Sequence, residues 1–149
     1  KMECLVIVDM QPAFSSAKKE ETIRNVIKMV IRAKAKDIPI IVLEYKNYGA
    51  TIERITQAIG DYPLARTEIK TRDSGSEQVM IALQKMGYDI ESFLICGVNY
   101  GACVAKTILG LLQYKKKIIV SQRCCNEPHN WNKNTTTREL RKRNVLVTK

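Results

Sequence analysis

Residues 4–9 read CLVIVD, an unbroken apolar run that ends at the carboxyl group of Asp9. Runs of this kind, without alternation of polar residues, are typical of a strand buried on both faces of a sheet. Similar short runs predict further strands at residues 38–43, 65–70, 93–96, 118–120 and 145–147. The first predicted strand is therefore a core strand with the charged side chain of Asp9 at its carboxyl end.

Amphipathic helices are predicted between these strands. Apolar residues at spacings of three and four indicate helices at residues 19–36, 51–59, 76–86, 102–114 and 135–143. Strands that alternate with helices predict an α/β protein with a three-layer α-β-α arrangement, a six-stranded, mostly parallel sheet and helices on both faces, Rossmann-like in class. At 149 residues, one domain covering residues 1–149 is the expected organisation.

The formal net charge is +10, but the basic residues are scattered along the chain. No aromatic residues interleave with them as stacking platforms, so a solvated surface is favoured over a nucleic-acid interface. The surplus of Lys and Arg leaves an anionic substrate or partner as the alternative.

The cysteine and histidine content argues against disulfides and metal sites. The chain has five cysteines and one histidine, with no C-x-x-C pair. An odd cysteine count disfavours a disulfide framework, and zinc would have too few ligands. We expect reduced thiols and no cofactor. No apolar run is long enough to cross a bilayer, and no secretory signal opens the sequence, so we predict a cytoplasmic protein.

Charged and nucleophilic residues follow three of the predicted strands. Asp9 ends the first strand, Lys70 ends the third, and the loop 97–103 follows the fourth. In open parallel sheets, ligands bind at the carboxyl ends of the strands, near the point where the strand order reverses. We therefore expect these side chains to face one crevice.

The three side chains have complementary chemistry. Cys103 lies at the start of a predicted helix, where unpaired amides and partial positive charge stabilise a thiolate. Asp9 could take the thiol proton and later donate it to a leaving amine. An ammonium at Lys70 would favour both anions. Taken singly, each residue also has an ordinary interpretation: a packed thiol, a turn carboxylate and a surface lysine.

Three motifs resemble those of a known family. Residues 9–14, DMQPAF, resemble the pattern D-x-Q-x-x-F, and Lys70 is followed by Ser74 as in the same proteins. Residues 97–104, GVNYGACV, resemble G-V-x-x-x-x-C-V. The chain is thus similar to the isochorismatase-like cysteine hydrolases, which include nicotinamidase and N-carbamoylsarcosine amidohydrolase.

The resemblance implies specific roles. Cys103 would be the nucleophile, Asp9 the general base and acid, and Lys70 the cation beside both. A cis peptide bond would join Val98 to Asn99, and the amides of Asn99 and Cys103 would form the oxyanion hole. Substrate-binding positions would be Gln11, Phe14, Ser74 and Tyr100. The family also leads us to expect a homo-oligomer that acts on a small-molecule substrate.

The sequence departs from the family at several places. Tyr100-Gly101 stands where Thr-Asp is common, Gly75 replaces an aromatic residue, and Arg123 occupies the region of an acidic one. The stretch 44–48 reads EYKNY and has no histidine, so a metal-assisted nicotinamidase is disfavoured.

These departures leave three functions open. The leading hypothesis is cleavage of a small amide or related C–N bond through a covalent thioester. The alternatives are hydrolysis of an isochorismate-like vinyl ether and a non-catalytic relative that binds a ligand or a protein.

Overall fold

A six-stranded parallel sheet forms the centre of the computed structural model, which describes residues 2–130 and 132–149. The strand order is β3-β2-β1-β4-β5-β6, and all five pairings are parallel. The strands are β1 (Glu3–Val8), β2 (Ile40–Tyr45), β3 (Ala65–Lys70), β4 (Ser92–Val98), β5 (Lys117–Asn126) and β6 (Leu146–Thr148). The predicted fold class is confirmed, with every strand parallel.

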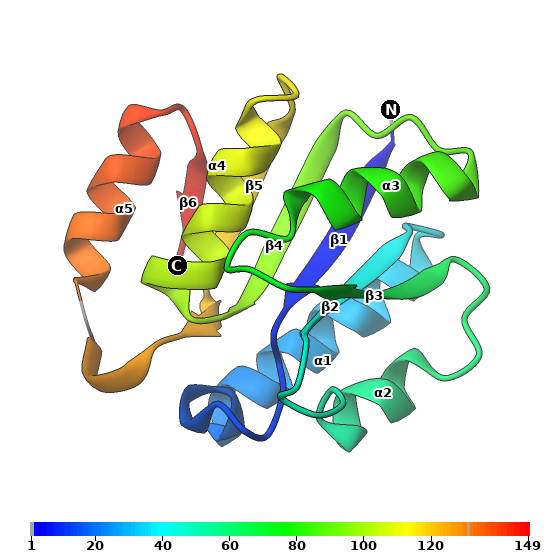
Figure 1. Ribbon diagram of the computed structural model, residues 1–149, viewed down its shortest axis with the longest axis horizontal. Helices are drawn as coiled ribbons and strands as arrows, with labels where there is room; N and C mark the ends of the chain where they lie inside the picture. Colours follow the sequence, from blue (N-terminus) through cyan, green and yellow to red (C-terminus); the bar gives the residue numbers. More distant parts are fainter. Residues whose placement is uncertain (1, 131) are drawn as a thin grey trace.

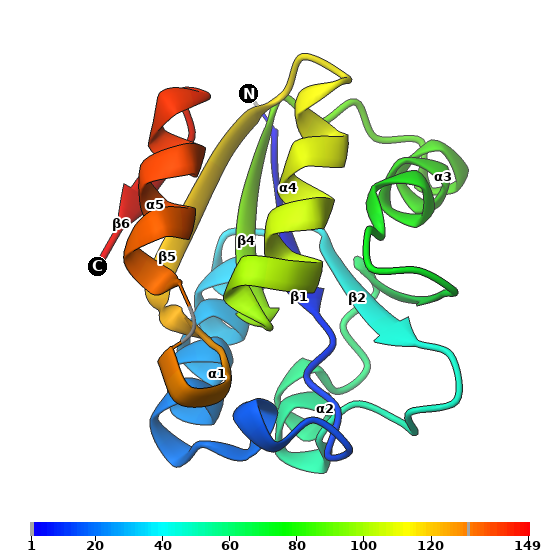
Figure 2. The same cartoon turned by 60° about the vertical axis from the view of Figure 1, so that its left-hand side comes forward.

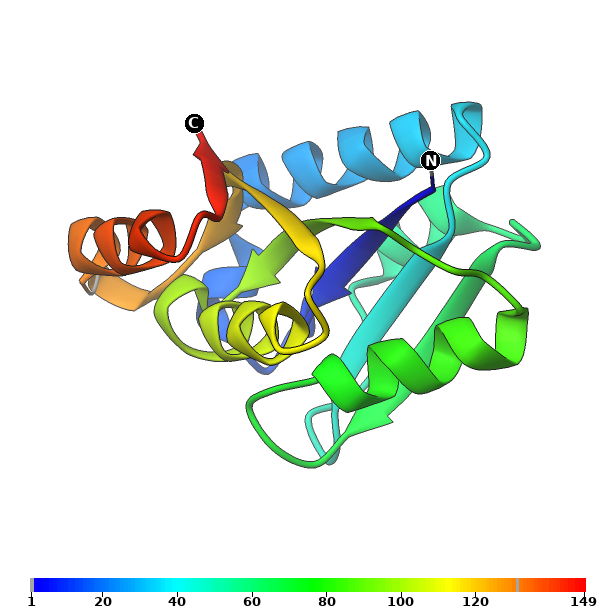
Figure 3. The same cartoon turned by 90° about the horizontal axis from the view of Figure 1, so that it is seen from above.

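Helices cover both faces of this sheet, as Figures 1 and 3 show. On one face lie α1 (Glu20–Ala35) and α2 (Glu53–Ile59), and on the other lie α3 (Ser76–Met86), α4 (Ala105–Leu112) and α5 (Lys133–Lys142). Each face has its own apolar cluster of buried residues. None of the helices in the described ranges combines the length and the apolar character that crossing a bilayer requires.

The central strand β1 explains why the predicted site residues lie at one edge of the sheet. Its residues 4–8 are fully buried, since helices cover both faces of the sheet there. The strand order reverses beside β1, because β2 pairs with one edge and β4 with the other. A crevice forms at the carboxyl ends of strands at such a switch point. Figure 2 shows the ends of β1 and β4 side by side at this edge of the sheet.

The fifth strand is longer than the sequence pattern predicts. β5 continues through Asn126, although Gln122 and Arg123 interrupt the apolar run. Its backbone still pairs with β4 beyond a register shift between Ile95 and Gly97. This irregularity bends the strands next to the predicted nucleophile loop, where β-bulges commonly re-aim side chains.

Gly97 allows β4 to approach β1 closely at this point. Its φ is +119°, a conformation that favours glycine. A Cβ atom here would lie 2.1 Å from the carbonyl oxygen of Val8, so backbone would have to move. The close approach lies one residue from Asp9 and from Val98, so it fixes the spacing of the two strand ends.

Replacing Gly97 with alanine tests this constraint. We expect Gly97→Ala to lower the free energy of unfolding by about 3 kcal/mol or more, since strain and a backbone clash add. Gly87→Ala is the matched control, because Gly87 also has positive φ (+77°) but nothing within 4 Å of the added atom. Its expected cost is about 1 kcal/mol. Urea denaturation measures both, and equal losses would contradict the argument.

Candidate active site

Asp9 turns away from the sheet immediately after β1. Its φ is +51°, a left-handed conformation that aspartate tolerates better than most residues. Its N–H donates to the carbonyl of Leu43 (3.1 Å), and its own carbonyl accepts from the N–H of Gln11 (2.8 Å). The carboxylate is 1% exposed. The chain therefore holds a buried charge at a fixed position.

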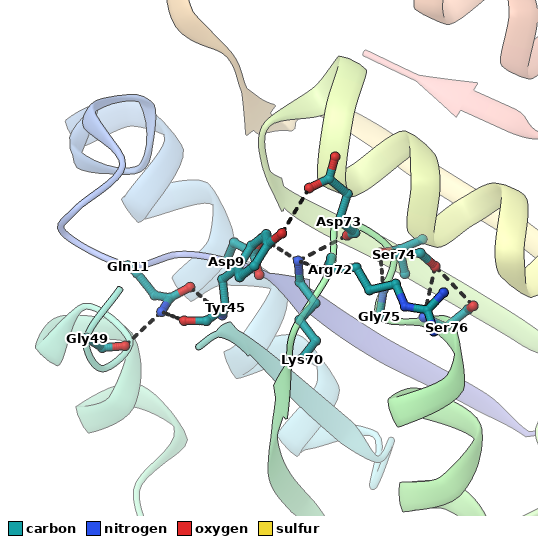
Figure 4. A network of polar contacts seen from close by, with 11 residues as sticks. Asp9, Gln11, Tyr45, Gly49, Lys70, Arg72, Asp73, Ser74, Gly75 and Ser76 are labelled. Carbon is teal, nitrogen blue, oxygen red and sulfur yellow. Dashed lines mark hydrogen bonds and ion pairs between the residues drawn. The ribbon is translucent and has the colours of Figure 1, made fainter. Parts of the chain in front are cut away.

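Lys70 neutralises that charge. Its Nζ lies 2.8 Å from Oδ2 of Asp9, and neither side chain is more than 1% exposed. Nζ also donates to the carbonyls of Arg72 and Asp73, at 3.0 Å each. The three ammonium protons thus have three oxygen partners, as Figure 4 shows. This arrangement holds the Lys70 ammonium in a fixed position against the Asp9 carboxylate.

The tight packing around the stem of Lys70 accounts for Gly75. A Cβ atom at this glycine would lie 2.4 Å from Leu43 and 3.0 Å from the Lys70 stem. The N–H of Gly75 donates to Oγ1 of Thr107 in α4 (3.0 Å). The aromatic residue that the family pattern leads one to expect at Gly75 would not fit this backbone.

Cys103 lies in a wide turn between β4 and α4. The turn, Tyr100–Val104, is a single π-helical turn, and the carbonyl of Asn99 accepts from the N–H groups of both Ala102 and Val104. Such π-helical turns occur frequently at functional sites. The preceding Val98–Asn99 peptide bond is cis, as the resemblance implies. The helical conformation thus begins at Tyr100, two residues earlier than predicted.

The charges of Asp9 and Lys70 act on the Cys103 thiol. Burial and then the Asp9 carboxylate raise the pKa of Cys103 to about 12, while Lys70 acts in the opposite direction. Burial also raises the pKa of Asp9, and this exceeds the lowering effect of Lys70. The resting pair is therefore a protonated thiol beside a carboxylate of increased basicity.

The Asp9 carboxylate can still accept a proton. Oδ2 of Asp9 forms the ion pair with Lys70, whereas Oδ1 has no hydrogen-bond partner within residues 2–130 and 132–149. Buried polar atoms without such partners are rare and call for an explanation. Likewise, the backbone N–H of Asn99 donates to no partner in the described ranges. Of these groups, the Asp9 carboxylate lies beside the Cys103 thiol.

Gln11 and Phe14 shape the wall next to this cluster. The Gln11 amide donates to the carbonyls of Tyr45 (3.0 Å) and Gly49 (2.7 Å), and it accepts from the N–H of Tyr45 (2.8 Å). Through these bonds Gln11 positions the 45–49 loop, and its role in substrate binding stays a prediction. Phe14 is half-buried and stacks on Tyr48, with ring centroids 4.7 Å apart.

Two predicted substrate-binding residues lie elsewhere. Tyr100 is 2% exposed, and its hydroxyl pairs with Oγ1 of Thr137 in α5 (2.7 Å), so it is a core residue. The Ser74 hydroxyl lies 3.1 Å from that of Ser76 at the start of α3. That turn packs against Gly110 of α4, where an added Cβ would meet both serines. Ser74 and Tyr100 are thus held by contacts within the protein, and their role in substrate binding stays a prediction.

Glu127 is a buried residue that the sequence analysis did not single out. It follows β5 and is 5% exposed; its Oε1 accepts from the N–H of Gly101 (3.1 Å) in the Cys103 turn. Burial raises the pKa of this carboxyl. The contact joins residues 26 positions apart in sequence, so no local sequence pattern predicts it. The one available signal was a charged residue, Glu127, directly after an apolar strand.

The parallel sheet thus carries a thiol, a carboxylate and an ammonium near its switch point, in an α/β fold with helices on both faces. The model of the Isochorismatase domain matches residues 3–149. The chain therefore belongs to the isochorismatase family and has the fold of its hydrolases. A comparison with curated proteins finds no match.

Solved structures share this fold at low sequence identity. The MAR1 ribonuclease of Caenorhabditis elegans has a TM-score of 0.87 and 18% identity, covering 99% of this chain and 76% of its own. A nicotinamidase/pyrazinamidase of Bacillus subtilis has a TM-score of 0.85 and 10% identity over 100% of both chains. An octameric hydrolase of unknown specificity from Escherichia coli has a TM-score of 0.82 and 15% identity, covering 99% and 74%.

Removing the Lys70 ammonium should destabilise the fold, because the buried Asp9 carboxylate loses its partner. We expect Lys70→Met to lower the free energy of unfolding by about 3–5 kcal/mol at pH 7, because a buried charge loses its partner. Without Lys70 the pKa of Asp9 rises further, so the carboxyl takes up a proton as the pH falls and the loss becomes smaller at pH 5.

Urea denaturation at the two pH values measures this effect. Arg54→Met is the control, since it breaks an exposed ion pair with Glu20 and should leave the urea midpoint nearly unchanged. A Lys70→Met loss that is equal at pH 5 and pH 7 would contradict the explanation.

Proposed function

We propose that this protein is a cysteine hydrolase that cleaves a small amide or related C–N bond through a thioester on Cys103. The observation that carries the proposal is the buried Asp9–Lys70 pair beside the thiol at the switch point of the sheet. A protein that only binds a ligand has no need for a buried carboxylate with unused lone pairs next to a cysteine. The sequence motifs and the family membership support the same chemistry.

In the first half-reaction, the sulfur of Cys103 attacks the carbonyl carbon of the amide while Asp9 takes the thiol proton. The raised pKa of Asp9 suits this transfer, since a more basic carboxylate accepts the proton more readily. The amides of Asn99 and Cys103 would stabilise the oxyanion. Asp9 then gives its proton to the leaving nitrogen, the C–N bond breaks and a thioester remains.

In the second half-reaction, water replaces the amine. Asp9, again ionised, takes a proton from water as its oxygen attacks the thioester carbon. The C–S bond breaks, and the sulfur recovers the proton from Asp9. The Lys70 ammonium stays beside Asp9 and balances the charge of the site. The products are a carboxylic acid, an amine or ammonia, and the free thiol.

Two variants distinguish the role of Asp9 from that of Cys103. We expect Cys103→Ala to abolish amide turnover and the thioester adduct, which intact mass spectrometry detects after an acid quench. Asp9→Asn should lower kcat by about 10²- to 10⁴-fold, because the general base is lost. The same change should slow alkylation of Cys103 by iodoacetamide, because burial holds the thiol pKa high and the carboxylate that takes the thiol proton is lost.

The pH profile provides a further check. Activity requires ionised Asp9, so it should fall with decreasing pH, with an apparent pKa above the ordinary value of 3.8. A panel of small primary and secondary amides supplies the substrates, and amine release is the measurement. Wild-type turnover by Asp9→Asn would refute the assignment of the base.

A second candidate function is binding of single-stranded RNA, which one surface feature favours. A hollow of about 600 Å³ beside α5 is lined by Arg138, Arg141, Lys142 and Lys149, together with Gln122, Asn134 and Thr137. None of these lining residues is acidic. One structure with the same fold carries the name of a ribonuclease. Phosphate groups would satisfy this concentration of positive charge.

Fluorescence anisotropy with a labelled single-stranded RNA across a salt series tests this candidate. The double variant Arg138→Ala/Arg141→Ala should reduce the log–log salt slope by about 0.7 for each phosphate group that the protein no longer neutralises. Arg24→Ala/Lys28→Ala on α1 removes equal charge from the other face of the sheet and should leave the slope unchanged. No binding at low salt would remove the candidate.

A further inference from the structure

The carboxylate of Asp73 occupies a defined position at the mouth of the site. Its Oδ1 accepts a hydrogen bond from the hydroxyl of Tyr45 (3.2 Å), and its backbone carbonyl accepts from the Lys70 ammonium (3.0 Å). Figure 4 shows the side chain above the Asp9–Lys70 pair. The group is exposed to solvent, but both ends of the residue are held in place.

The charge of Asp73 is not balanced locally. Asp9 and Lys70 neutralise each other, and no ion pair among the described residues involves Asp73. In Figure 4 the Arg72 side chain runs toward Ser76, away from Asp9. Beyond the larger effects of burial and Asp9, the Asp73 charge adds to the raised pKa of Cys103. The thiol therefore experiences two carboxylates and one ammonium.

Aromatic rings lie next to this negative charge. Tyr48 stacks on Phe14 and meets the edge of Tyr45, with centroids 4.7 Å and 5.3 Å apart, and it is 44% exposed. The Lys70 ammonium lies 4.0 Å from the centroid of the Tyr45 ring. Ring faces attract cations in this way, and such surfaces recognise alkylated ammonium groups.

We propose that Asp73, with the rings of Tyr45, Tyr48 and Phe14, selects a small amide that carries a positive charge close to its scissile bond. This inference rests on the proposed function and specifies its substrate class. A cation would gain from the unbalanced carboxylate and from the exposed ring surface. A carboxylate-bearing substrate would meet repulsion at the same place.

The net charge of +10 is a poor guide to the site, because it sums basic residues that are scattered along the whole chain. The hollow beside α5 contains four of them, on a helix and a chain end remote in sequence from Asp73. The global charge attracts anions to the protein surface, whereas the field at the thiol is set by the nearest charges. An anionic substrate, favoured from composition alone, is therefore not what the local charges select.

Thiol-directed probes of different charge test the inference without a known substrate. Methanethiosulfonates with a trimethylammonium, a neutral methyl or a sulfonate group differ in charge but share one reaction with Cys103. Each rate is divided by the rate of the same reagent with a small free thiol. Peptide mass mapping, with Cys103→Ala as the blank, assigns the label to this residue.

We expect the normalised rate of the cationic reagent to exceed that of the anionic one by about fivefold at low ionic strength. Asp73→Asn keeps an acceptor for the Tyr45 hydroxyl but removes the charge, so this preference should fall to near unity. Asp61→Asn, in the turn after α2, is the matched control with the same change in net charge, and it should retain the preference.

The outcomes separate this inference from the proposed function. A wild-type preference for the anionic reagent, or an unchanged preference in Asp73→Asn, overturns the inference even if amides are hydrolysed. A preference that depends on Asp73 supports it, even if no amide is turned over and the amidase proposal fails. Where turnover occurs, Asp73→Asn should raise KM for cationic amides and leave KM for neutral ones nearly unchanged.

Discussion

The buried ion pair between Asp9 and Lys70 is the constraint on which the rest of the site depends. Two charges leave water at the centre of a sheet, and only their contact and the carbonyls around Lys70 offset the loss of solvation. The pair requires that the ends of β1 and β3 come to the same edge although β2 separates them. The turn after β3 surrounds the Lys70 ammonium and supplies the carbonyls that solvate it. Gly75 allows this turn to pack closely, because a side chain there would clash with Leu43 and the Lys70 stem.

The pair also decides the chemistry available to the thiol. A cysteine at the start of a helix, taken alone, would be expected to ionise easily. Here burial and the neighbouring carboxylate oppose ionisation, and the pKa of Cys103 rises to about 12. The proton therefore stays on sulfur until a base removes it during attack. For the pKa of this thiol, the charges within a few ångströms matter more than the strongly basic composition of the whole chain.

Much of this structure could be predicted from the sequence, and the exceptions have physical reasons. The predicted bounds of the strand at 65–70 and of the helix at 76–86 agree with the structure to the residue. Apolar spacing and the glycine after Met86 mark the bounds of these elements in the sequence. The second half of β5 was missed, since backbone pairing holds Gln122 and Arg123 in the sheet despite their polarity. The Tyr100–Thr137 and Gly101–Glu127 contacts were not anticipated, because these partners are set by tertiary packing between distant segments.

The wide turn that carries Cys103 is braced from behind by residues that come later in the chain. Glu127 accepts from Gly101, and Thr137 pairs with Tyr100. During synthesis on the ribosome, the cysteine emerges before either brace exists, and domains fold as the chain lengthens. In a nascent chain that ends before α5, Tyr100 lacks its partner Thr137, so the turn that carries Cys103 has lost one of its two supporting hydrogen bonds.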